Sequence, residues 1–63
     1  MTLIHKPEHN VAHSLIESGV AHVQFRTEAG CQQFIKDNRS AIKSAHIHWN
    51  VDYEPVLTFT AAR

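Results

Sequence analysis

The sequence predicts a small two-layer α+β domain in which helices pack on one face of a three-stranded mixed sheet, in the order α-β-α-β-β. Residues 7–18 and 28–44 carry apolar residues at helical spacing. Residues 20–26, 45–53 and 56–60 instead alternate between apolar and polar. A chain of 63 residues is short enough to form one domain, which we assign to residues 1–63.

The first predicted element is a helix over residues 7–18. Pro7 suits the first helical position, and Gly19 is a natural terminator. Between them, one helical face collects the apolar residues Val11, Ala12, Leu15 and Ile16. A strand from Val11 to Glu17, paired through Gly19 with the next segment, is the alternative. Both faces of that strand would mix apolar and polar residues, so we favour the helix.

The first predicted strand covers residues 20–26. Its buried face holds Ala21, Val23 and Phe25, and its wet face holds His22, Gln24 and Arg26. A helix follows, and a parallel crossover through it to the next strand would be right-handed.

Thr27 is positioned to cap this second helix, which we expect to continue to about Ser44. Its apolar stripe consists of Cys31, Phe34, Ile35, Ala41, Ile42 and Ala45. We therefore expect Cys31 to pack in the core rather than to bind a metal. Asn38 lies in the middle of the stripe, where an unsatisfied amide would cost stability. It either bonds across a dimer interface or marks where the helix leaves the core. Lys36, Arg39 and Lys43 form a separate basic stripe.

The two remaining strands form a hairpin around a turn at residues 52–55. In residues 45–53, Ile47, Trp49 and Val51 point to the core, opposite His46, His48, Asn50 and Asp52. In residues 56–60, Leu57 and Phe59 point one way. Among the aromatic residues, this pattern leaves only Tyr53 free.

The composition excludes several classes of protein. Six basic and six acidic residues give zero net charge, which disfavours bulk electrostatic binding to nucleic acid or anionic lipid. No run is apolar and long enough for a membrane span, and Met1–Lys6 lacks the core of a signal peptide. A lone cysteine fits a reducing compartment, so we expect a cytoplasmic protein. The small core predicts a homodimer or a larger protein partner.

Six histidines are the least usual feature of the chain. His46 and His48 project from one strand face, and His22 from a neighbouring strand could complete a zinc site with a free position for water. His9 and His13, four apart on the predicted first helix, offer a second ligand pair. The placement of these histidines has a simpler explanation, because a solvent-exposed sheet face normally carries polar residues. We therefore expect no cofactor and keep zinc as the alternative.

No complete catalytic constellation or cofactor fingerprint is visible. We therefore predict a non-enzymatic binding protein, a regulator or inhibitor that docks on a larger macromolecule, of the kind that phages and mobile elements encode. The residues expected to bind the partner are Arg26, Lys36, Arg39, Lys43, His46, His48 and Asn50. Two alternatives stay open: a nucleic-acid-binding regulator that uses the basic residues, and a histidine-rich zinc-binding protein.

Overall fold

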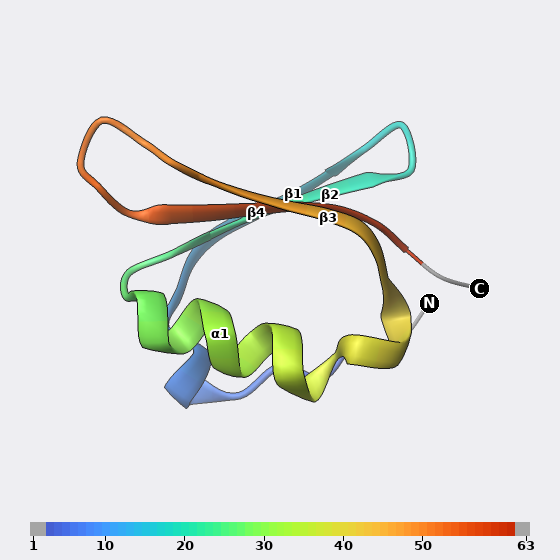
Figure 1. Ribbon diagram of the computed structural model, residues 1–63, viewed down its shortest axis with the longest axis horizontal. Coiled ribbons are helices and arrows are strands. Elements are labelled where there is room, and N and C mark those ends of the chain that lie inside the picture. Colours follow the sequence, from blue (N-terminus) through green and yellow to red (C-terminus); the bar gives the residue numbers. More distant parts are fainter. Residues whose placement is uncertain (1–2, 62–63) are drawn as a thin grey trace.

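The computed structural model describes residues 3–61, which form a four-stranded antiparallel sheet with one α-helix across one of its faces (Figure 1). The strands are β1 (Val11–Glu17), β2 (Val20–Phe25), β3 (Ile42–Trp49) and β4 (Pro55–Ala61), and the helix is α1 (Glu28–Asp37). Two short 3-10 helices are η1 (Pro7–His9) and η2 (Arg39–Ala41). The predicted α-β-α-β-β order with a three-stranded mixed sheet is therefore wrong. The observed order is β-β-α-β-β.

The predicted first helix is a strand, β1, in a tight hairpin with β2. Glu17 pairs with Val20, and the two residues between them, Ser18 and Gly19, have φ of 53° and 78°. Two positive φ angles are typical of the type I′ turn, whose twist matches that of the flanking strands. A register shift between Val11 and His13 breaks the alternation of β1. Beyond the shift, His13, Leu15 and Glu17 share one face and Ser14 and Ile16 share the other, and all five are exposed, so both faces mix apolar and polar residues.

The helix α1 begins as predicted but ends earlier. The Thr27 side chain accepts the backbone N–H of Gly30 at 3.0 Å, which confirms the predicted cap. The helix stops at Asp37 rather than near Ser44. After η2 the chain enters β3 at Ile42, three residues earlier than predicted. Ser44 has a φ of 49° inside a second register shift, which puts Lys43 and His46 on the same face and so hides the alternation at the start of β3.

The predicted parallel crossover is wrong because β4 lies between β2 and β3. Leu57 of β4 is opposite Val23 of β2 on one side and Ile47 of β3 on the other, and both pairings are antiparallel. The last strand is therefore central, and β1 and β3 are the two edges of the sheet.

The core lies between α1 and the sheet face turned toward it, here called the inner face. Its buried hydrophobic members are Ala21, Val23, Phe25, Cys31, Phe34, Leu57 and Phe59. Phe34 is at the centre, with its ring centroid 5.3 Å from that of Phe25 in an edge-on arrangement. The core positions predicted for β2, Phe34 and Phe59 are confirmed, as is that of Cys31. Trp49 and Ile47, also predicted to be core, are 52% and 41% exposed.

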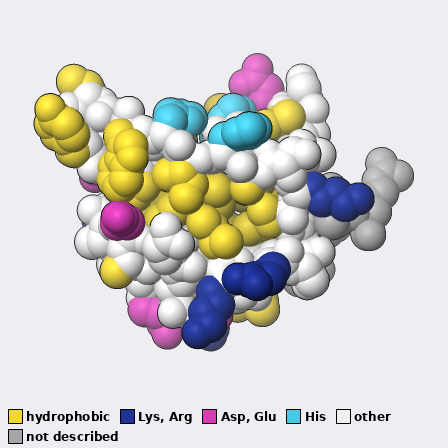
Figure 2. Space-filling view, in the orientation of Figure 1, with side chains coloured by type: hydrophobic (Ala, Val, Ile, Leu, Met, Phe, Trp, Pro, Cys, Tyr) yellow, Lys and Arg dark blue, Asp and Glu magenta, His cyan; other side chains and the backbone are white. Residues whose placement is uncertain are grey.

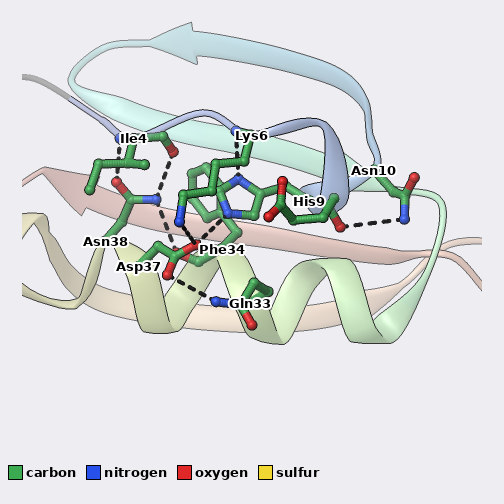
Figure 3. Close-up of polar contacts among 9 residues, drawn as sticks. Ile4, Lys6, His9, Asn10, Gln33, Phe34, Asp37 and Asn38 are labelled. Carbon is green, nitrogen blue, oxygen red and sulfur yellow. Dashed lines mark hydrogen bonds and ion pairs between the residues drawn. The ribbon is translucent and has the colours of Figure 1, made fainter.

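Residues 3–10 cross the flank of α1, and polar contacts fasten them there (Figure 3). The Asn38 side chain accepts the N–H of Ile4 at 2.6 Å and donates to the carbonyls of Ile4 and Phe34, both at 3.0 Å. Asn38 is thus satisfied within its own chain, and a bond across a dimer interface is not needed. A Cβ on Gly30 would lie 2.1 Å from the carbonyl oxygen of His9, so this crossing requires glycine.

Candidate functional site

Four large apolar side chains on and just after the edge strand β3 are exposed: Ile47 and Trp49 on β3, and Val51 and Tyr53 in the β3–β4 loop. We call these four residues the apolar patch. Val51 and Tyr53 are 90% and 85% exposed. Figure 2 shows apolar side chains gathered between the sheet and the helix and continuing toward the β3–β4 hairpin at the left. Tyr53 was expected to be free, but the sequence placed Trp49 and Val51 toward the core.

The loop that carries half of the patch has a defined shape. The Asn50 side-chain oxygen accepts the backbone N–H groups of Asp52 and Glu54, both at 2.9 Å. The backbone N–H of Tyr53 donates to the carbonyl of Asn50 at 3.0 Å. The Glu54 carboxylate accepts a bond from the Gln24 amide at 2.8 Å, which ties the loop to β2. Asn50, predicted to bind a partner, therefore organises the loop that presents Val51 and Tyr53.

The four predicted cationic residues lie on different elements. Lys36 lies on α1, Arg39 on η2 and Lys43 at the start of β3. Arg26, just after β2, donates to the Val11 carbonyl at 3.3 Å. It lines an open hollow of about 430 Å³ with His5, Lys6, Pro7, Asn10 and Val11. The basic residues predicted as one binding surface are thus distributed over several elements.

Four histidines project from the outer face of the sheet, which is turned away from α1: His13, His22, His46 and His48. One cross-strand row runs from Leu15 through His22 and Thr58 to His46. The predicted trio His22, His46 and His48 therefore shares a face. However, β4 separates His22 from His46, so their backbones are about 10 Å apart. His22 instead contacts the Thr58 hydroxyl at 3.4 Å. In the described part of the chain, residues 3–61, no three metal-ligating side chains converge.

His9 has a different environment from the other histidines. Its side chain is fully buried against Phe34, with ring centroids 5.3 Å apart. Its Nδ1 accepts the backbone N–H of Lys6 at 3.2 Å, so the proton is on Nε2, which donates to Asp37 at 2.8 Å. This bond, aided by a bond from Gln33 and the charge of Lys6, lowers the pKa of the Asp37 carboxyl despite some desolvation.

His9 and His13 are consequently not the ligand pair that the helix prediction implied. His9 is in η1 inside the core, whereas His13 is exposed on the outer face of β1.

The Cys31 thiol is poorly suited to act as a nucleophile or metal ligand. Burial, with a smaller contribution from the charge of Glu28, raises the pKa of this thiol to about 11, which suppresses the reactive thiolate.

Comparisons with known proteins give no relative: no family model, no curated protein and no solved structure matches the chain. Among residues 3–61, no helix is long and apolar enough to cross a membrane. Functional inference therefore depends on the surface of this molecule alone.

Proposed function

We propose that this is a non-enzymatic regulatory protein that acts in the cytoplasm by docking on a larger protein through its apolar patch. The observation that carries the proposal is the exposure of Ile47, Trp49, Val51 and Tyr53 within one stretch of seven residues. Contiguous exposed apolar surface of this kind marks interaction sites. Tryptophan and tyrosine are also enriched among the residues that dominate binding energy at protein interfaces.

The backbone beside the patch supports the same reading. Strand β3 is an edge strand, so one side of it presents N–H and C=O groups to an incoming chain. An extended segment of a partner can pair with such an edge while its side chains contact Ile47 and Trp49. The organised loop around Asn50 holds Val51 and Tyr53 in place, which reduces the entropy lost on binding.

The nucleic-acid alternative has less support from the geometry. Base stacking requires exposed aromatic rings beside cationic side chains. Trp49 lies on the inner side of the sheet, whereas Lys43 is in line with Thr60 on the outer face. Sheet platforms that bind RNA use aromatic residues on the open face of the sheet. Among the described strand residues, that face carries histidine, threonine, glutamine, lysine and aliphatic side chains but no phenylalanine, tyrosine or tryptophan.

Affinity capture with matched variants tests the proposal. The tagged wild-type chain and Ile16→Lys, which alters the other edge, should retain the same partner protein at a fixed ratio from an extract of native cells after nuclease treatment. Trp49→Lys should lose it, and the purified partner should bind the wild-type chain directly. Equal retention by Trp49→Lys, or loss of binding on nuclease treatment, would contradict docking through the patch.

A further inference from the structure

Strand β3, one of the two edge strands, carries imidazole side chains on one face and apolar side chains on the other. His46 and His48 project to the outer face, in line with Thr58 and Val56 of β4. Ile47 lies on the inner side, in line with buried Leu57, and Trp49 follows it there. Residues 46–49 contain no carboxylate, lysine, arginine or proline, and the register shift of β3 comes before Ile47, between Lys43 and His46. This stretch lacks the devices that commonly protect sheet edges.

A second copy of the chain fits this edge when the two β3 strands run antiparallel about a two-fold axis at Ile47. In that register Ile47 faces Ile47 of the second copy, and each Trp49 is diagonal to that isoleucine on the inner side. On the outer side, His46 of each copy faces His48 of the other. In this register the apolar side chains of the two copies meet on the inner side, and their imidazoles meet on the outer side.

The resulting four imidazoles have the spacing of a metal site. Side chains directly opposite on antiparallel strands have Cβ atoms about 4.5–5.5 Å apart. Positions two apart on one strand are about 7 Å apart. Imidazole nitrogens that lean inward from such a rectangle can reach about 2.0–2.1 Å from one zinc ion, which takes four ligands. One chain offers only two of these ligands, in keeping with the lack of a three-ligand cluster within residues 3–61.

The limited area of the contact explains why a metal would be needed. A stable interface buries about 800 Å² per partner. An aromatic side chain buries about 150–250 Å² in total, and Trp49 has only about half of its surface free. A four-residue strand contact therefore falls short by itself. The edge strand β1 is a poorer candidate, because its exposed Leu15 and Ile16 point to opposite faces.

We propose that two copies of the chain pair through β3 and that His46 and His48 of both copies together bind one Zn²⁺ ion. The site is incomplete in one chain, so zinc binding and dimerisation are coupled. Because the dimer covers Ile47 and Trp49, zinc would also control access to the apolar patch. This last consequence rests on the proposed function, whereas the zinc-bound dimer does not.

Zinc titration of the full-length chain tests the site. Calorimetry should give one Zn²⁺ per two chains, and sedimentation should show a dimer Kd about 5- to 150-fold lower with zinc than with EDTA, the usual range for coupled binding. The double variant His46→Gln/His48→Gln should lose both effects. The matched variant His13→Gln/His22→Gln, on the same face but off β3, should keep them. Circular dichroism melting confirms that each variant folds.

Several results would overturn the proposal. These are one zinc per monomeric chain, zinc-linked dimerisation that persists in His46→Gln/His48→Gln, or a dimer Kd that zinc leaves unchanged. A separate experiment tests the register: with zinc and added oxidised glutathione as the oxidant, Ile47→Cys should form an intermolecular disulfide, and Leu15→Cys on β1 should not. Partner capture in EDTA distinguishes a failure of one proposal from a failure of the other. If the chain has no zinc site, docking through the apolar patch is unaffected.

Discussion

The Nε2 atom of His9 and the Oδ2 atom of Asp37 are 2.8 Å apart, although 28 residues separate them in the sequence. The imidazole is fully buried and the carboxylate is mostly so. Lys6 contacts the same oxygen at 3.5 Å, and Gln33 donates to the other oxygen at 2.9 Å (Figure 3). This cluster joins the segment before β1 to the last turn of α1.

Replacing His9 should therefore be costly. His9→Ala removes packing against Phe34 and leaves the N–H of Lys6 without its acceptor. We expect a loss of about 2–4 kcal/mol in the free energy of unfolding, as for other truncations of large buried side chains. Urea denaturation measures it. His13→Ala, at an exposed position, is the control and should change stability by less than about 0.5 kcal/mol. Equal effects of the two variants would contradict the structural role of His9.

The Asp37 carboxyl makes stability depend on pH. Its pKa lies below the ordinary value of 3.8, chiefly because of the His9 bond, so the folded state favours the ionised form. A lowered pKa stabilises the fold above about pH 3.8, and that contribution disappears as the pH falls through the folded-state pKa. Asp37→Asn should be less stable than the wild type at pH 7, and the difference should shrink below pH 4. A stability difference between the two proteins that stays constant down to pH 2 would disprove the role of the Asp37 carboxylate.

Gly30 should tolerate no side chain, despite its place in a helix. Alanine normally favours a helix over glycine by about 1 kcal/mol. Here its Cβ would meet the His9 carbonyl at 2.1 Å, and this neighbour is backbone that the surrounding bonds hold in place. We expect Gly30→Ala to destabilise by about 1–3 kcal/mol, in the range of overpacked sites. Thermal melting checks this, with the exposed Gln32→Ala as control. A stabilised Gly30→Ala variant would show that residues 3–10 can move away from α1.

The thiol of Cys31 should be nearly inert in the folded protein. With a pKa of about 11, only about one thousandth of it is thiolate at pH 8, and the side chain is buried. Reaction with a chromogenic disulfide reagent at pH 8 should be slow and should accelerate sharply in 6 M guanidinium. The Ser14→Cys variant, with an exposed thiol, provides the rate of a free group. Similar rates for both thiols would contradict the buried position.

Local patterns in the sequence identify β2, the Thr27 cap and the Phe34 core position. In each case a short stretch of sequence contains the whole signal. The first segment is different, because Val11, Ala12, Leu15 and Ile16 fit a helical stripe as well as a bulged edge strand. Positive φ at Ser18 and Gly19 decides between the two, by making the hairpin turn. The place of β4 between β2 and β3 depends on long-range pairing and cannot be read from local periodicity.

The apolar patch was missed for a related reason. Alternation shows that Ile47 and Trp49 share a face, but it does not show how far the covering layer extends. A helix of ten residues is about 15 Å long, too short to cover the full length of the sheet. Figure 1 shows that the β3–β4 hairpin lies on the side of the N-terminal end of α1 and extends past it, which leaves the outer part of β3 exposed. His22, His46 and His48 were correctly placed on exposed strand faces, whereas His9 and His13 were wrongly placed on one helix. The separation of His22 from His46 by β4 depends on the strand order.

The central place of β4 also bears on synthesis of the protein. β2 obtains its second neighbour only through long-range pairs such as Val20 with Thr60. The β1–β2 hairpin alone is marginal in water, and Phe25 and Phe34 cannot be enclosed before Leu57 and Phe59 arrive. While its last strand is still inside the ribosomal tunnel, the nascent chain has no stable core. Chaperones that bind exposed apolar segments can therefore reach the chain until β4 has paired with β2 and β3.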